Sequence, residues 1–212
     1  MLEEDMKNKI TIVDYGVGNL FSLCSSLRYI GADAEVTGDA EKIRNATHII
    51  LPGVGAFADA AKKLRDSGLD RVIIDEAKKG KFIMGICLGM QMLFEKSFEY
   101  GEHEGLGLIK GDVVGMEGRL DKSLKIPHIG WNALSVKREH PLLKYVKDGD
   151  CVYFVHSYFA DNCEGAVIAD TEYGERITAA VGVGNVMGCQ FHPEKSGDVG
   201  LGILRAFAEL EA

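Results

Sequence analysis

The sequence lacks long apolar runs and has little proline. No stretch approaches the ~18 consecutive apolar residues of a membrane-spanning helix, so no membrane segment is expected. The 212 residues include only 4 prolines, and no repeat, low-complexity tract or linker interrupts them. A chain of this length can bury one substantial core. We therefore expect a single domain over residues 1–212.

Positive charge is also scarce. The 24 lysines and arginines are outnumbered by 32 aspartates and glutamates, which gives a formal charge of −8, and no basic cluster offsets this balance. A nucleic-acid-binding surface is therefore not expected. The 5 cysteines form no Cys-x-x-Cys pair, and the acidic stretch Met1 to Asp5 does not resemble the start of a signal peptide. We therefore expect a cytoplasmic protein without disulfides.

Strand and helix patterns alternate in the first half of the chain. Short apolar runs predict strands, and amphipathic or capped stretches predict helices. The expected strands are residues 9–14, 34–37, 47–51 and 82–86, and the expected helices are residues 20–29 after a capping Asn19, 39–44, 59–67, 69–79 and 88–95. This alternation is typical of a parallel sheet with helices on both faces.

From residue 108 onward the pattern changes to short β segments. They are expected at residues 110–115, 134–136, 151–155, 166–169, 177–181 and 186–191, with a closing helix at residues 199–210. Gly182 to Asn185 is typical of a hairpin turn between the last two strands. We therefore predict an α/β protein with antiparallel β elements in its C-terminal half.

Cys87 stands where a strand is expected to meet a helix, inside Gly85-Ile86-Cys87-Leu88-Gly89. Such a corner crowds the backbone, so small residues are needed on both sides, and Gly85 and Gly89 supply them. The thiol would then be held above the sheet, at a helix N-terminus whose dipole and free N–H groups favour the thiolate. Taken alone, Cys87 could equally be a small buried hydrophobic residue.

A second motif, Gln190-Phe191-His192-Pro193-Glu194, supplies what a cysteine nucleophile needs. These needs are a base and a group that orients the base, and the three residues normally lie far apart in sequence. His192 and Glu194 are two residues apart, so on an extended segment both side chains point to one side. We therefore expect Cys87, His192 and Glu194 to form a catalytic triad.

The motif Gly-x-Cys-x-Gly-x-Gln at residues 85–91, followed by His-Pro-Glu at residues 192–194, resembles the class I (triad) glutamine amidotransferases. The order and the separation of the two motifs make this resemblance specific. It implies a three-layer, flavodoxin-like fold with a central, mostly parallel sheet, and a glutaminase activity without a cofactor. No metal is expected either, because His103 has no second histidine at ligand spacing.

The segment Leu51-Pro52-Gly53-Val54-Gly55 leaves a core strand at the edge where open α/β sheets bind ligands. Gly53 and Gly55 allow backbone conformations closed to other residues, so N–H groups can be aimed into a site. From the residues alone, the segment could be a plain loop. By resemblance it is an oxyanion strand, in which the N–H groups of Val54 and Leu88 stabilise the tetrahedral oxyanion. The resemblance also implies that glutamine is bound by Gly53, Gly55, Gln91, His156, Ser157 and Tyr158.

The chain's only tryptophan lies in Pro127-His128-Ile129-Gly130-Trp131-Asn132, a poor composition for a buried strand. An exposed aromatic residue of this kind is often an interface anchor. Together with Lys195-Ser196 and the opening Asp14 to Asn19, the segment resembles the glutaminase subunits of imidazole glycerol phosphate synthase, a group within the same family.

This second resemblance implies a heterodimer. In that group the ammonia passes to a (β/α)8-barrel cyclase, which makes imidazole glycerol phosphate and an aminoimidazole carboxamide ribotide in histidine biosynthesis. The barrel would have to be a separate chain, because 212 residues leave no room for it. The residues expected at the interface are Pro127, Trp131, Asn132 and Lys195.

Three alternatives stay open at this point. A glutaminase subunit of another pathway would keep the triad, but it would not be expected to contain the segment at residues 127–132 or Lys195-Ser196. A cysteine peptidase or thioesterase could share the strand-to-helix corner at Cys87. If Cys87 were buried and unreactive, the chain could be a non-catalytic, flavodoxin-like binding module.

Overall fold

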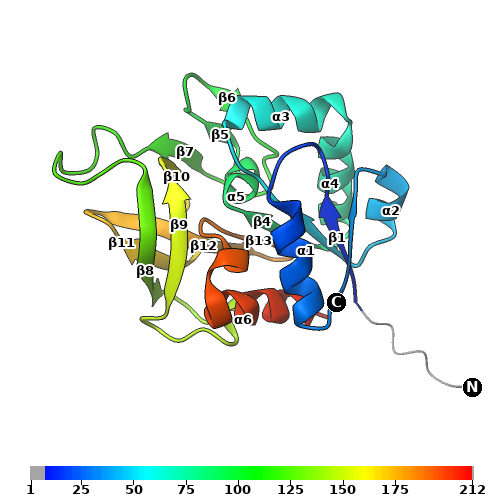
Figure 1. Cartoon of the computed structure of the whole chain (residues 1–212). Coiled ribbons are helices and arrows are strands. Elements are labelled where there is room, and N and C mark those ends of the chain that lie inside the picture. Colours follow the sequence, from blue (N-terminus) through cyan, green and yellow to red (C-terminus); the bar gives the residue numbers. More distant parts are fainter. Residues whose placement is uncertain (1–7, 212) are drawn as a thin grey trace, which may run out of the picture.

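A computed structural model describes residues 8–211, so Met1 to Asp5 lie outside the described residues. Helices and strands alternate in the first half, as predicted (Figure 1). The elements are β1 (Lys9–Val13), α1 (Leu20–Tyr29), β2 (Asp33–Thr37), α2 (Ala40–Arg44), β3 (His48–Leu51), α3 (Phe57–Asp66), α4 (Leu69–Lys78), β4 (Phe82–Ile86) and α5 (Leu88–Met92). Asn19 precedes α1, but its side chain makes no capping hydrogen bond.

The second half is rich in strands and ends in a helix. Its elements are β5 (Lys96–Ser97), β6 (His103–Glu104), β7 (Asp112–Gly115), β8 (His128–Val136), the 3₁₀ turn η1 (Pro141–Leu143), β9 (Cys151–His156), β10 (Tyr158–Asp161), β11 (Val167–Glu172), β12 (Arg176–Val183), β13 (Val186–Cys189), the 3₁₀ turn η2 (Pro193–Lys195) and α6 (Gly197–Ala208). Within residues 8–211, no helix has the length and apolar character needed to cross a membrane.

The central sheet contains nine strands within the described residues, in the order β2-β1-β3-β4-β13-β12-β11-β8-β9. The first five pair in parallel, and their order is the 2-1-3-4-5 order of flavodoxin-like folds. The remaining pairs are antiparallel. The predicted α/β fold, with antiparallel elements in the C-terminal half, is therefore confirmed.

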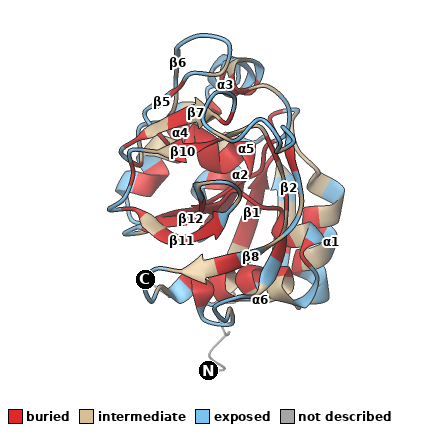
Figure 2. Ribbon diagram, turned by 90° about the vertical axis from the view of Figure 1, so that its left-hand side faces the viewer, coloured by how far each residue is buried: buried red, intermediate tan, exposed pale blue. Residues whose placement is uncertain are grey.

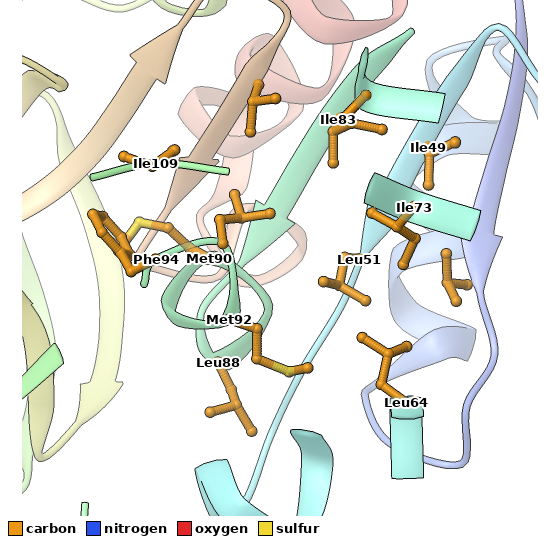
Figure 3. Packing of buried hydrophobic residues seen from close by; sticks show 14 of the residues in the cluster. Ile49, Leu51, Leu64, Ile73, Ile83, Leu88, Met90, Met92, Phe94 and Ile109 are labelled. Atoms are coloured by element: carbon orange, nitrogen blue, oxygen red, sulfur yellow. The ribbon is translucent and has the colours of Figure 1, made fainter. Parts of the chain in front are cut away.

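Helices cover both faces of the parallel strands. In Figure 1, α1 and α6 lie together on one face, and α3 and α4 lie on the other. On β3, Ile49 and Leu51 pack into the cluster with α3 and α4, whereas Ile50 between them packs into the cluster with α1 and α6. The central strands are largely buried (Figure 2), and Figure 3 shows Leu51 beside Leu64 of α3 and Ile73 of α4. Apolar residues on both faces of a strand are typical of this layered arrangement.

A small four-stranded sheet, β10-β7-β5-β6, was not predicted. Its first strand, β5, follows α5, which ends at Met92 instead of the predicted residue 95. The helix stops because the later chain binds its last carbonyl groups: the N–H of Leu106 donates to Met92 at 2.8 Å, and that of Leu108 donates to Leu93 at 2.9 Å. His103, expected in a solvated loop, lies in β6 of this sheet.

Strand β8 begins at His128, six residues before the predicted start at residue 134. Residues His128 to Ala133 pair with β9, where Trp131 lies opposite Tyr153, whereas Leu134 to Val136 pair with β11. The composition predicted only the part that pairs with β11. Ile129 and Trp131 are exposed on the other part, which agrees with the expectation that this segment is not a buried strand.

Candidate active site

A cavity of about 520 Å³ lies where the parallel strands end. Val54 follows β3, Cys87 follows β4 and His192 follows β13, and all three line the cavity. The carboxyl ends of parallel strands are where open α/β sheets bind ligands. The predicted site residues in its lining are Val54, Gly55, Cys87, Leu88, Gln91, Pro127, His156, Ser157, Tyr158, His192 and Lys195.

Cys87 occupies a strained corner at the start of α5. Its φ of 54° and ψ of −113° are unusual for a residue with a side chain, and such a backbone costs on the order of 1–3 kcal/mol. The corner is held by a hydrogen bond of 2.8 Å from the Cys87 N–H to the carbonyl of Cys189. A Cβ at Gly85 would lie 2.6 Å from the carbonyl oxygen of Gly89. Glycine is therefore needed at this position because no side chain would fit. Because α5 has only five residues, its dipole contributes less than the prediction assumed.

The predicted oxyanion strand packs directly on this corner. Gly55 has a φ of 92°, a backbone conformation that favours glycine, as expected. Gly53 has no such backbone, and glycine is needed there because a Cβ would lie 2.6 Å from the nitrogen of Gly89 and 2.9 Å from the Cβ of Leu88. The Tyr15 hydroxyl, missed from the sequence, donates to the carbonyl of Pro52 at 2.7 Å and anchors the strand. Oxyanion binding by Val54 and Leu88 stays a prediction.

His192 and Glu194 form the expected pair. Nδ1 of His192 lies 2.8 Å from Oε1 of Glu194, and each side chain is only 3% exposed. The predicted extended segment is wrong, however, because Pro193–Lys195 forms the 3₁₀ turn η2 and Glu194 folds back within it. Ser196 fixes the turn, since its hydroxyl donates to the carbonyl of His192 at 2.7 Å and accepts from the N–H of Tyr153 at 3.0 Å.

The neighbours of His192 favour its charged form. Burial lowers the pKa of His192, but hydrogen bonds to Cys87 and Glu194 and the charges of both outweigh this effect and raise the pKa to about 9. At neutral pH the imidazole is therefore protonated beside Cys87, where it can give a proton to a leaving group. Glu194, which does not line the cavity, contacts Nδ1 of this imidazole and contributes to its raised pKa.

Gln91 and His156 have roles that the sequence only partly indicated. The side-chain N–H groups of Gln91 donate to the carbonyl of Tyr158 at 2.9 Å and to Oε1 of Gln190 at 3.0 Å, so only its own carbonyl oxygen is left for a ligand. His156 lies 2.8 Å from the same Tyr158 oxygen and 3.1 Å from the ring of His128. Burial lowers the pKa of His156 to about 3, so its neutral ring forms part of the cavity wall.

Glu99 is a cavity residue that the sequence analysis missed. Its Oε2 accepts a hydrogen bond of 2.6 Å from the N–H of Phe57, which holds the half-buried carboxylate at the cavity. No local pattern could have found it, because Glu99 lies in an irregular stretch between β5 and β6. The other lining residues that were not predicted are Tyr100, Gly115, Glu117, Ile126 and Val155.

Residues 8–211 contain no group of three histidine, cysteine or acidic side chains arranged to hold a metal ion. His103 lies in β6 and does not line the cavity. Among the chemical groups in the cavity lining are the thiol of Cys87, the imidazole of His192, the amide of Gln91 and the carboxylate of Glu99.

The residues expected to bind a partner differ in what they expose. Trp131 is 56% exposed, as predicted, and the centre of its ring lies 6.1 Å from the centre of the Tyr153 ring. Nζ of Lys195 lies 5.8 Å from the centre of the same Tyr153 ring. The Asn132 side chain is engaged within the chain, with Oδ1 2.8 Å from His128 and Nδ2 donating to the carbonyl of Glu172 at 3.1 Å. The interface itself stays a prediction.

The fold and the site have counterparts among known proteins. A family model described as glutamine amidotransferase class-I matches residues 11–208. The chain therefore belongs to the class-I glutamine amidotransferase family. Among solved structures, PurLQS from Thermotoga maritima has the same fold, with a TM-score of 0.75, 24% identity, and coverage of 95% of this chain and 98% of that chain.

More similar relatives place the chain within that family. Imidazole glycerol phosphate synthase subunit HisH of Caldanaerobacter subterraneus subsp. tengcongensis is 53% identical over 202 residues, which are 95% of this chain and 98% of the relative. The subunit of the same name in Bacillus subtilis is 46% identical over 206 residues, which are 96% and 97% of the two chains. At this identity and coverage, the chain belongs to the HisH group.

Proposed function

We propose that the chain is the glutaminase subunit of an imidazole glycerol phosphate synthase and serves histidine biosynthesis. The observation that carries this proposal is the cavity in which Cys87, at a φ of 54°, meets the buried pair of His192 and Glu194. The similarity to HisH subunits supports the pathway. The chemistry is the hydrolysis of glutamine to glutamate and ammonia.

In the first half-reaction the Cys87 thiolate attacks the γ-carboxamide carbon of glutamine. As the carbon–sulfur bond forms, the carbonyl electrons move onto the oxygen, where the N–H groups of Val54 and Leu88 stabilise them. When the carbonyl re-forms, the carbon–nitrogen bond breaks, and protonated His192 gives its proton to the nitrogen, which leaves as ammonia. The product on the enzyme is a γ-glutamyl thioester.

In the second half-reaction water hydrolyses the thioester. Neutral His192 takes a proton from water as the oxygen attacks, and Glu194 stabilises the imidazolium that results. The carbon–sulfur bond then breaks and its electron pair returns to sulfur, so glutamate leaves and the thiolate is restored. No metal or cofactor enters either step.

The cavity also offers groups for the amino-acid part of glutamine. The Glu99 carboxylate is positioned by its hydrogen bond from Phe57 and would pair with the α-ammonium group. The free carbonyl oxygen of Gln91 would accept a further N–H from the substrate. Gly53, Gly55, His156, Ser157 and Tyr158 would shape the rest of the binding site, with Gly53 acting through its contact with α5.

The proposed partner is a separate cyclase with a (β/α)8-barrel fold, joined to this chain as a heterodimer. Exposed Ile129 and Trp131 on β8 would supply its apolar contact, beside Pro127, Asn132 and Lys195. Ammonia would pass from Cys87 to this partner. We place the complex in the cytoplasm, where the five cysteines, all of them free, would stay reduced.

The test measures glutamate and ammonia release from glutamine by the chain alone and with the cyclase, together with hydrolysis of peptides and acyl thioesters. Hydrolysis of glutamine that requires Cys87 would support the proposal. Activity on peptides or thioesters but not on glutamine would contradict it. Labelling by a glutamine-like electrophile separates both results from a non-catalytic binding module, which would leave Cys87 unmodified.

A further inference from the structure

Gln190 lies beside the nucleophile because of how two strands pair. Strands β4 and β13 run parallel, and Cys189, the last residue of β13, is in register with Ile86, the last residue of β4. The residues that follow them, Gln190 and Cys87, are therefore neighbours. The main-chain N–H of Gln190 donates to the carbonyl of Ala179 at 2.8 Å, and its side chain is fully buried.

The side-chain amide of Gln190 contacts the reacting atom. Its Nε2 donates to Sγ of Cys87 at 3.7 Å, while its Oε1 accepts from Nε2 of Gln91 at 3.0 Å. The second contact fixes the orientation of the amide. If the amide were turned over, its oxygen would face the sulfur and its NH₂ group would face the NH₂ group of Gln91, so both hydrogen bonds would be lost.

We propose that Gln190 is a further catalytic residue, which stabilises the Cys87 thiolate through a hydrogen bond to Sγ and takes no part in proton transfer. The proposal deepens the glutaminase function and rests on it. A hydrogen bond to a charged acceptor is stronger than one to a neutral acceptor. The contact therefore favours thiolate over thiol, which adds to the effect of the charged His192 on the same sulfur.

The same contact acts differently at different stages of the reaction. As sulfur attacks, its negative charge moves to the carbonyl oxygen of glutamine, and the bond from Gln190 weakens. When water has added to the thioester and the carbon–sulfur bond breaks, the electron pair returns to sulfur and the bond strengthens. Gln190 therefore assists the departure of the thiolate, whereas the oxyanion groups assist the formation of both tetrahedral intermediates.

Gln91 supports this arrangement from the opposite side. One of its N–H groups holds Oε1 of Gln190, and the other binds the carbonyl of Tyr158, which lines the cavity. Gln91 thus links the wall of the glutamine site to the group that contacts the sulfur. Gln190 does not line the cavity, so its effect reaches glutamine only through Cys87 and Gln91.

The test compares Gln190→Glu with wild type in the full chain. Glutamate keeps the oxygen that accepts from Gln91 but puts a second oxygen where the donor to Cys87 stood. The rate of alkylation of Cys87 by iodoacetamide is followed over a series of pH values, and mass spectrometry of the Cys87 peptide separates it from exposed Cys151. We expect the rate near neutral pH to fall about tenfold or more, and the profile to move to higher pH.

Two further variants make the result specific. Thr178→Val changes another buried polar side chain, one that contacts Cys163 and not Cys87, and its profile should match wild type. Gln190→Met removes the donor without adding charge. It replaces Gln190→Glu if thermal unfolding shows that Gln190→Glu is not folded. A folded Gln190 variant with the wild-type profile would overturn the proposal.

Cys87→Ala separates this proposal from the underlying function. If Cys87→Ala still hydrolyses glutamine with the cyclase, the glutaminase assignment of Cys87 fails and the role of Gln190 falls with it. If Cys87→Ala is inactive while the Gln190 variants keep both the alkylation profile and the turnover of wild type, only the role of Gln190 is wrong.

Discussion

Gly53→Ala should impair catalysis although Gly53 does not line the cavity. The added methyl group would lie 2.6 Å from the nitrogen of Gly89, 2.9 Å from the Cβ of Leu88 and 3.0 Å from its carbonyl carbon. Non-bonded carbon atoms prefer separations of about 3.5–4.0 Å. The oxyanion strand and the start of α5 must therefore move apart by roughly 0.5–1 Å.

This movement separates the two groups proposed to bind the oxyanion. Val54 moves with Gly53, whereas Leu88 stays with Cys87 on the corner. A misplacement of about 1 Å can cost about 10²-fold in rate, and removal of one oxyanion donor costs about 10²–10³-fold. We therefore expect kcat to fall about 10²-fold, with a stability loss of about 1–3 kcal/mol from the crowded packing.

The assay is glutamine hydrolysis by the complex with the cyclase, alongside urea unfolding of the isolated chain. Gly165→Ala is the matched control, because a Cβ at Gly165 would meet no atom within 4 Å and its φ is not positive. This control should keep wild-type kcat and change stability by at most about 1 kcal/mol. A folded Gly53→Ala chain with the kcat of the control would refute the reasoning.

Three further outcomes are expected. Cys87→Ala should abolish glutamine hydrolysis while the complex still uses added ammonium, and substantial remaining hydrolysis would contradict the choice of nucleophile. The pKa of His192, raised to about 9 in the folded chain from 6.5, contributes stability that is fully present below pH 6.5 and is lost as pH rises through about 9. Glu194→Gln should therefore flatten the decline of Tm over this range, and an unchanged decline would contradict the charged pair. Trp131→Ala should weaken cyclase binding by about 1–4 kcal/mol without lowering Tm, whereas an unchanged Kd would contradict its role as an interface anchor.

The parallel half of the sheet was predictable because each strand carries its own signal. β3 and β4 are short apolar runs that are buried on both faces, and such runs stand out against the helices between them. β5, β6 and the start of β8 carry no such signal. The first two have two residues each, and the first part of β8 is half-exposed with a single neighbour. Their strand character comes from pairing with distant segments.

The residues of the site also divide into those with a local sequence signal and those without one. Cys87 and the pair of His192 and Glu194 were predictable because each motif is local, although the 3₁₀ turn that joins the pair was not. Glu99 was not predictable, because its place at the cavity depends on the N–H of Phe57 at the start of α3. Gly53 was predicted for the wrong physical reason, since the crowding that requires glycine comes from α5.

The motif at residues 85–91 and the motif at residues 190–194 form the site only together. Cys87 and Gln91 come from the first, and they meet His192 and Gln190 of the second only because β13 adds to the sheet beside β4. A hairpin with β12 carries β13 to that position, so the antiparallel half of the sheet brings the base to the nucleophile. The reactivity of Cys87 therefore depends on the register between β4 and β13. A slip by one residue would turn the side chains of one strand to the opposite face and separate Cys87 and Gln91 from Gln190 and His192, even if both strands remained in the sheet.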